Sequence, residues 1–112
     1  MAENNQFNSL KEFYPFYLQQ HSDSICRYLH FIGTAGFITI VIYSFIAENY
    51  WLLLFGPLCG YGFAWFGHFV FEKNKPATFK HPFYSLISDF IMFYHMMTFQ
   101  MAGQLKKHLT KI

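Results

Sequence analysis

Two long apolar stretches dominate the pattern of hydrophobic and polar positions along the chain. Leu29–Ala47 and Tyr50–Phe71 contain no Asp, Glu, Lys or Arg, and only two residues separate them. Each stretch has about the 20 apolar residues with which a helix crosses a bilayer. The turn is so short that the two helices must be antiparallel neighbours. The pattern therefore predicts a transmembrane hairpin, with helices near Ile25–Ala47 and Trp51–Phe71.

Small residues recur on both arms of this predicted hairpin. Gly56 and Gly60 are one helical turn apart on the second arm, and Gly33 and Gly36 lie on the first. Small residues let helix backbones approach closely in lipid. We therefore expect close packing of the two arms, with a local kink at Pro57.

The N-terminal flank has helical periodicity of its own. Ser9–Glu12 fits a capping box that opens a helix. The aromatic and apolar residues that recur at helical spacing are Phe7, Leu10, Tyr14 and Tyr17. We interpret Ser9–Gln20 as a short interfacial helix whose aromatic side lies in the lipid headgroups, and we expect Pro15 to kink or shorten it. A loosely ordered arm is the alternative.

The C-terminal third begins with the polar loop Lys73–Pro82. A third apolar segment follows, at about Phe83–Leu105, and the basic tail Lys106–Ile112 ends the chain. Because Asp89 and His95 interrupt this segment, it could cross twice as two short helices, dip in and return, lie in the interface, or cross once. We favour an even number of crossings, with the two polar side chains forming either a buried pair or outer support for a site.

Composition strengthens the membrane interpretation. Of the 112 residues, 54% are hydrophobic and 12% are charged, whereas soluble domains have about 25% charged residues. The net charge of +2 includes no basic cluster of the kind that nucleic acid requires. We predict an all-α fold, in which residues 1–112 form one small integral membrane helical bundle.

The placement of charge predicts an orientation. The positive residues that flank the hairpin are Lys11, Arg27, Lys73, Lys75 and Lys80. The turn between the arms carries only Glu48. By the positive-inside rule both ends of the hairpin face the cytoplasm. The membrane would be the inner membrane of a bacterium or that of the endoplasmic reticulum of a eukaryote.

The two apolar stretches also carry candidate chemistry. His30 lies 19 residues before Asn49, and His68 lies 19 residues after it. In a helical hairpin each histidine rises about 28 Å from the turn. The two imidazoles should therefore lie at the same level on the same end, where a metal could sit between them.

Other polar residues converge on that end. His21 precedes the first arm, His81 follows the second, and Glu72 is four residues beyond His68 on the same helix face. Imidazole and carboxylate ligands with open positions suit non-haem Fe(II) and O₂ chemistry. The plainer interpretation is that the histidines contact lipid headgroups and that Glu72 pairs with a nearby Lys or Arg.

Two other functional classes stay open on these residues. Facing histidines at equal height also suit a bis-histidine haem protein that transfers electrons. A non-catalytic, lipid-binding membrane scaffold would use the same histidines only as headgroup contacts. The extra histidines and the glutamate favour a non-haem metal.

Two blocks of sequence resemble a known family. The opening pattern is a histidine, a second histidine nine residues later and then a glycine. Its residues in this chain are His21, Arg27, His30 and Gly33. Gly67–Ala77 matches the most distinctive block, and Thr78–Pro82 is similar to the short bacterial-type branch. Over roughly Phe13–Phe93 the chain resembles the membrane family of 2-hydroxy fatty acid dioxygenases of phytosphingosine α-oxidation, formerly a domain of unknown function.

The resemblance implies an Fe(II)-dependent α-oxidation. A 2-hydroxy fatty acid and O₂ would give CO₂ and a fatty acid one carbon shorter. His21, His30 and His68 are implied as iron-binding or otherwise essential residues, while His81 matches only the short branch.

These implications lead to a hypothesis for the site. Iron lies among the three histidines, and Glu72 or His81 completes or orients its ligand shell. Arg27, Lys73 or Lys75 attracts the substrate carboxylate at the interface. The acyl chain lies between the helices or in the bilayer.

Overall fold

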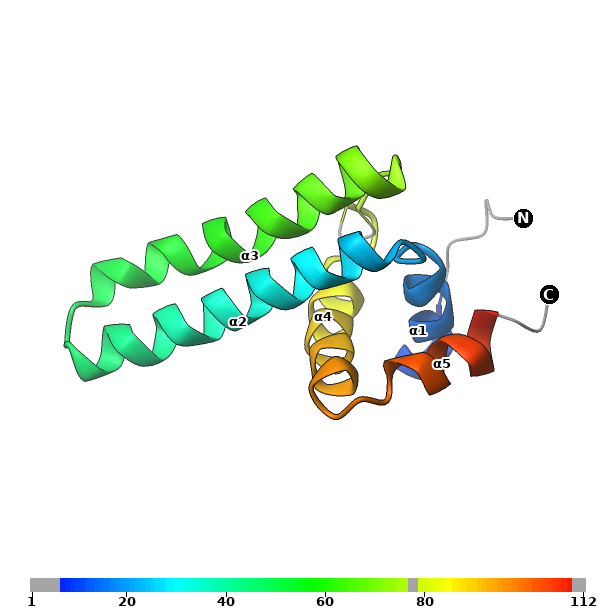
Figure 1. Ribbon diagram of the computed structural model, residues 1–112. Coiled ribbons are helices and arrows are strands. Elements are labelled where there is room, and N and C mark those ends of the chain that lie inside the picture. The colour runs from blue at the N-terminus through cyan, green and yellow to red at the C-terminus, as the bar shows by residue number, and fades with distance from the viewer. Residues whose placement is uncertain (1–6, 77–78, 110–112) are drawn as a thin grey trace.

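The computed structural model describes residues 7–76 and 79–109 (Figure 1). Its elements in chain order are α1 (Leu10–Gln19), α2 (Ser24–Ile46), the 3₁₀ helix η1 (Tyr50–Leu54), α3 (Phe55–Phe66), the π-helical turn η2 (Gly67–Glu72), α4 (Pro82–Met97) and α5 (Met101–Leu109). The described residues form helices and no strand, which confirms the predicted all-α class. Ala77 and Thr78 of the family-like block and the end of the basic tail, 110–112, lie outside the described residues.

The hairpin is present, and α2 runs antiparallel to the η1–α3–η2 arm (Figure 1). The second arm changes its helix type twice, which the sequence pattern did not predict. Pro57 lies in the first turn of α3, where its missing N–H needs no partner within the helix. The 3₁₀ segment precedes it, so the irregularity expected at the proline falls at the start of α3.

Glycines allow the close approach that the sequence predicted. A Cβ on Gly33 would lie 2.9 Å from the carbonyl oxygen of Gly60 and 3.1 Å from the Cβ of Phe63. No side chain fits there without moving backbone. The two arms of the hairpin are therefore in backbone contact along this stretch.

Helix α1 begins as its sequence predicts. The Ser9 hydroxyl accepts a hydrogen bond from the Glu12 amide at 3.2 Å, and the Glu12 carboxylate accepts one from the Asn8 amide at 3.1 Å. These bonds satisfy amides that have no partner within the helix. The helix then continues through Pro15 to Gln19.

The prediction that the aromatic side of α1 lies in the lipid headgroups was wrong. Instead of facing lipid headgroups, this side is buried against α4 and α5. The cluster consists of Phe13, Tyr14, Tyr17 and Leu18 of α1 with Met92 of α4 and Met101 of α5. Helical periodicity identified the apolar face of α1, but it could not identify what covers that face.

The covering partner is the third apolar segment, which folds back on itself. It breaks at 98–100, where Phe99 has a φ of 60°, into α4 of 16 residues and α5 of nine. At about 1.5 Å per residue, α4 is shorter than the ~30 Å hydrocarbon core of a bilayer. The segment therefore consists of two short helices, which pack against α1 at the open end of the hairpin (Figure 1).

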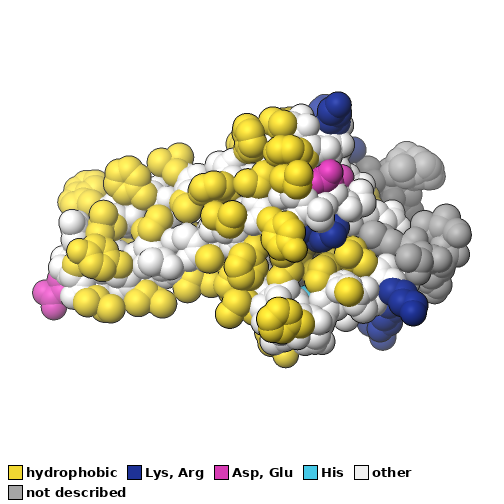
Figure 2. All heavy atoms as spheres, viewed as in Figure 1, with side chains coloured by type: hydrophobic (Ala, Val, Ile, Leu, Met, Phe, Trp, Pro, Cys, Tyr) yellow, Lys and Arg dark blue, Asp and Glu magenta, His cyan; other side chains and the backbone are white. Residues whose placement is uncertain are grey.

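Within the described residues, two helical segments are long and apolar enough to span a membrane, Ser24–Ile46 and Tyr50–Glu72. Only 22% of each apolar window is buried within the protein. Large side chains such as Ile46, Trp51 and Leu58 are 68–78% exposed. Figure 2 shows the hairpin largely covered by hydrophobic side chains, with Lys and Arg gathered toward its open end. Exposed apolar surface of this extent is typical of a face that contacts a membrane or another protein.

We expect the Gly33 contact to be essential for hairpin packing. Gly33→Ala should destabilise the protein by about 1–3 kcal/mol, because the new methyl group meets backbone. Gly62→Ala is the matched control, since its Cβ would meet nothing within 4 Å. Thermal unfolding in detergent should show a lower Tm for Gly33→Ala and an unchanged or higher Tm for Gly62→Ala. Equal Tm values would contradict the contact.

Candidate metal centre

The open end of the hairpin gathers three histidines from different segments. His21 follows α1, His30 lies in α2, and His68 lies in η2. All three are buried, with exposed fractions of 1%, 5% and 1%. The ring centroids of His30 and His68 are 4.9 Å apart, which confirms that the two arms present them at the same level.

The Nε2 atoms of the three imidazoles face one another. The Nε2 atom of His21 lies 2.9 Å from Nε2 of His30 and 3.0 Å from Nε2 of His68. A neutral imidazole carries one proton, on either Nδ1 or Nε2. The hydrogen-bond partner of Nδ1 on each ring therefore shows whether Nε2 is protonated.

The outer nitrogen of His21 and that of His30 both face backbone carbonyl groups. His21 Nδ1–H donates to the carbonyl oxygen of Tyr17 at 2.7 Å, and His30 Nδ1–H donates to that of Cys26 at 3.0 Å. A carbonyl oxygen can only accept, so the proton is on Nδ1 in both rings. Burial and the neighbouring His30 and His68 rings hold the pKa of His21 well below its usual range, which keeps it neutral.

The outer nitrogen of His68 faces a side-chain amide. His68 Nδ1 lies 2.7 Å from Oδ1 of Asn74, while the Asn74 amide nitrogen donates to the carbonyl oxygen of Gln20 at 3.2 Å. Because the Gln20 carbonyl only accepts, the amide orientation is determined and Oδ1 must face the ring. His68 therefore also carries its proton on Nδ1.

All three Nε2 atoms are thus unprotonated acceptors that converge in a buried space. Acceptors cannot bond one another, and buried acceptors without a donor are costly. A cation resolves both problems. Two nitrogens bound at right angles to one ion at about 2.1 Å lie about 3.0 Å apart, which matches the distance of the His21 Nε2 atom from each of the other two. The cluster could hold a metal.

Local backbone features place His68. A Cβ on Gly67 would lie 3.0 Å from Sγ and 3.2 Å from Cα of Cys26, so only glycine lets η2 approach α2 this closely. The π-helical turn ends at Lys73 in the left-handed region, with a φ of 60°. The Asn74 amide then donates back to the His68 carbonyl at 3.0 Å. This turn brings the Asn74 side chain to the ring it orients.

Glu72 holds the connector that carries His21. Its carboxylate accepts hydrogen bonds from the Asp23 amide and from the Ser22 hydroxyl, the latter at 3.3 Å. Arg27 Nη1 also holds the connector, by donating to the His21 carbonyl at 2.7 Å. The structure therefore places Glu72 beside the connector backbone, outside the three-histidine cluster.

The other residues singled out in the sequence lie apart from the cluster. The His81 ring packs against Phe7, Phe13 and Phe16. The side chains of Lys73 and Lys75 are exposed. Neither these lysines nor Arg27 lines either cavity described below.

A tyrosine–aspartate pair borders the histidines. The Tyr17 ring stacks on His21 with centroids 4.0 Å apart, and its hydroxyl donates to Oδ1 of Asp89. Burial raises the pKa of Asp89 to about 7. The sequence left open whether Asp89 and His95 pair with each other; the structure pairs each with a tyrosine of α1, His95 with Tyr14 at 2.9 Å. The sequence signal for Asp89 was an acidic residue inside an apolar segment. This signal could not identify Tyr17 as its partner.

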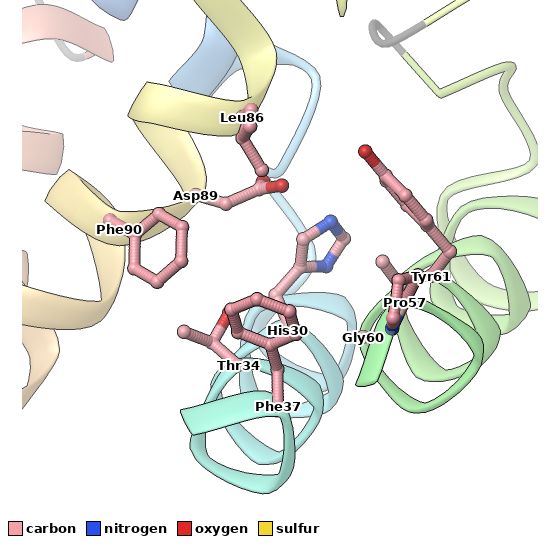
Figure 3. Close-up of a pocket in the computed structure, with 10 residues that line it drawn as sticks. His30, Thr34, Phe37, Pro57, Gly60, Tyr61, Leu86, Asp89 and Phe90 are labelled. Atoms are coloured by element: carbon pink, nitrogen blue, oxygen red, sulfur yellow. The ribbon is translucent and has the colours of Figure 1, made fainter. Parts of the chain in front are cut away.

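Two adjoining cavities lead away from the histidines. A cavity of about 20 Å³ is lined by all three rings, and one of about 250 Å³ extends from His30 between α2, α3 and α4. Figure 3 shows His30 and Asp89 at the larger cavity, with Phe37 and Phe90 beside it. The site therefore combines a narrow polar end with a wider apolar end.

We predict that the purified protein binds one divalent transition metal per chain. His21→Ala, His30→Ala and His68→Ala should each lower metal occupancy strongly, because each removes one of three converging acceptors. Elemental analysis after dialysis measures the occupancy. His95→Gln, which changes a partly buried histidine outside the cluster, is the control and should keep the metal. Full occupancy in all three alanine variants would contradict the site.

Asn74 should act through His68 rather than on the metal itself. Asn74→Ala removes the acceptor that orients the His68 ring, and loss of such outer bonds typically weakens metal affinity about 10–100-fold. Metal titration against a competing chelator should show this weakening at unchanged stoichiometry. A wild-type affinity in Asn74→Ala would mean that the bond does not orient the ring.

A known protein family matches most of the chain. A family model described as 2-hydroxy-palmitic acid dioxygenase Mpo1-like matches residues 7–101, which include all three histidines. No curated protein and no solved structure matches the chain.

Proposed function

The chain belongs to the Mpo1-like family of 2-hydroxy-palmitic acid dioxygenases, and from this premise we propose that it is an Fe(II)-dependent dioxygenase of 2-hydroxy fatty acids. The observation that carries the proposal is the convergence of three unprotonated Nε2 atoms in a buried space. Three imidazoles leave open positions on an ion that prefers six ligands, and imidazole is a suitable ligand for iron.

The proposed reaction balances without a further reductant. A 2-hydroxy acid and O₂ give CO₂, water and a fatty acid one carbon shorter. The bond between C1 and C2 breaks, C1 leaves as CO₂, and C2 becomes the new carboxyl carbon. When bound, iron would supply the redox chemistry that lets O₂ react with the acid. The protein positions the acid and excludes water.

The larger cavity is suited to the acyl chain. It lies between three helices, begins at His30, and is lined mainly by apolar side chains that include Phe37 and Phe90. A fatty acid that enters this space would have its polar end at the histidines and its alkyl chain along the hairpin. The acid would thus be bound with C1 and C2 nearest the metal site.

Charged residues act around this site in our proposal. Arg27, Lys73 and Lys75 attract the carboxylate toward the open end of the hairpin, since they lie at or near that end. Glu72 is a positioning residue, because it holds the connector that presents His21. We assign no ligand role to His81, whose ring packs among phenylalanines.

We further propose that the hairpin crosses a membrane and that its open end faces the cytoplasm. The apolar sides of both arms are mostly unburied within the protein, and the flanking positive charges lie at the open end. The substrate class fits this location, since a long-chain acid partitions into lipid. Both ends of the hairpin and the short helices α4 and α5 then lie on one side.

The geometry disfavours the bis-histidine haem alternative. Haem needs a wide flat slot between its two axial imidazoles. Here the ring centroids of His30 and His68 are only 4.9 Å apart, the His21 ring packs against both, and the cavity lined by all three is about 20 Å³. A non-catalytic scaffold, the other alternative, has no use for three buried acceptors without donors.

The activity is tested with purified, iron-loaded protein and 2-hydroxypalmitate labelled at C1. We expect O₂ uptake, release of the label as CO₂ and formation of pentadecanoate in equal amounts. His68→Ala should lower the rate at least ~100-fold, because it removes a ligand rather than an outer partner. His95→Gln should retain the rate.

Removal of iron by a chelator should abolish turnover, and Fe(II) should restore it. Product formation that persists in the iron-free protein would contradict the proposal. So would a Soret band in the active protein, because it would favour haem.

A further inference from the structure

Two buried hydrogen-bond donors at the histidine site have no partner. Trp65 Nε1 and Ser85 Oγ are both inaccessible to solvent, and neither bonds any residue in the part of the chain that the structure describes. Both side chains line the cavity of about 20 Å³ that the three histidines also line. The two residues that carry the unpaired donors therefore line the same cavity as the three histidines.

Each donor would ordinarily be satisfied. An indole N–H can only donate, so a buried one requires an acceptor. A serine within a helix commonly donates to the carbonyl one turn before it, but the His81 carbonyl accepts the Ser85 backbone amide at 2.9 Å and the hydroxyl forms no such bond. Buried donors left unpaired are costly, and in native proteins they point to a missing partner.

We propose that Trp65 Nε1–H and Ser85 Oγ–H bind one carboxylate oxygen of the substrate. This inference rests on the proposed function, because it takes the substrate to be a 2-hydroxy fatty acid. It assigns the carboxylate end to the small cavity and the alkyl chain to the larger one.

The two cavities differ in size and polarity, as the two ends of the substrate do. The small one has room for about one water-sized polar group. The large one, about 250 Å³, is apolar and shares His30, Tyr61 and Asp89 with it. An acid that crosses this junction has C1 held by the two donors and C2 next to the histidines. The bond that the reaction breaks then lies beside the metal site.

The charges at the site agree with this assignment. Both proposed donors are neutral, so they can remain buried when no substrate is bound at less cost than a lysine or arginine. The acidic side chain at the junction, Asp89, already accepts the Tyr17 hydroxyl through Oδ1 and so does not use these donors. Specificity for an acid over an alcohol would then come from Trp65 and Ser85.

The test measures binding separately from turnover. Metal-loaded protein in detergent is titrated under nitrogen with 2-hydroxypalmitate and with 1,2-hexadecanediol, which keeps the chain and the 2-hydroxyl but lacks the carboxylate. Trp65→Phe removes the N–H and keeps an aromatic ring, and Ser85→Ala removes the hydroxyl. Each variant should raise the Kd for the acid about tenfold or more and the Kd for the diol much less, because the C1 hydroxyl is a weaker acceptor than a carboxylate.

The chain offers matched controls for both substitutions. Ser88→Ala removes another buried, unpartnered hydroxyl of α4, from a residue that lines neither cavity. Trp51→Phe changes the other tryptophan, which is 78% exposed. Both controls should bind acid and diol as the wild type does. Metal content and circular dichroism of every variant show whether the site and the fold are intact.

The outcomes separate this inference from the proposed function. Acid affinity that is unchanged in both Trp65→Phe and Ser85→Ala overturns the inference, since the donors then hold only a buried water; turnover by the wild type would still support the dioxygenase. Equal loss of acid and diol affinity also overturns it, because the defect is then one of shape. Selective loss for the acid in a protein that never releases CO₂ supports the carboxylate site and contradicts the reaction.

Discussion

The structure depends on three nitrogen lone pairs that point at one another. Each imidazole gives its single proton to an outer acceptor, so no proton is left for the space between the rings. Acceptors at 2.9 and 3.0 Å repel one another, and all three rings are buried away from bulk solvent. A cation among the three nitrogens would turn this arrangement into a stabilising one. The metal ion would therefore contribute to folding at the open end as well as to chemistry.

Much of the surrounding fold can be understood as support for that convergence. Glycines draw the two arms together, and Gly67 lets η2 reach Cys26 beside His30. The Glu72 carboxylate fixes the connector that carries His21, and α1 is held in turn by α4 and α5. Ligands from the connector and from both arms must be positioned at once, so a small bundle needs these long-range contacts. The apolar cavity is the space left between the hairpin and α4.

The sequence predicted the part of the site that depends on helix geometry alone. His30 and His68 meet because equal rise on two antiparallel helices is a local property. Local rules also explain the cap at Ser9 and the glycine contacts. They could not place Tyr17, because periodicity shows which face of a helix is apolar but not whether lipid or protein covers it. The role of Asn74 depends on a left-handed residue after a π-helical turn, and neither has a clear sequence signal.

A membrane setting joins these features into one account. In the proposed function, two arms with apolar outer sides would deliver a long-chain acid to a polar end, where three imidazoles are oriented by their outer hydrogen bonds. The most direct test is X-ray absorption at the edge of the bound metal. The account predicts three imidazole nitrogens in the first shell and light oxygen ligands in the remaining positions. A first shell with a sulfur ligand, or with fewer than three imidazoles, would contradict it.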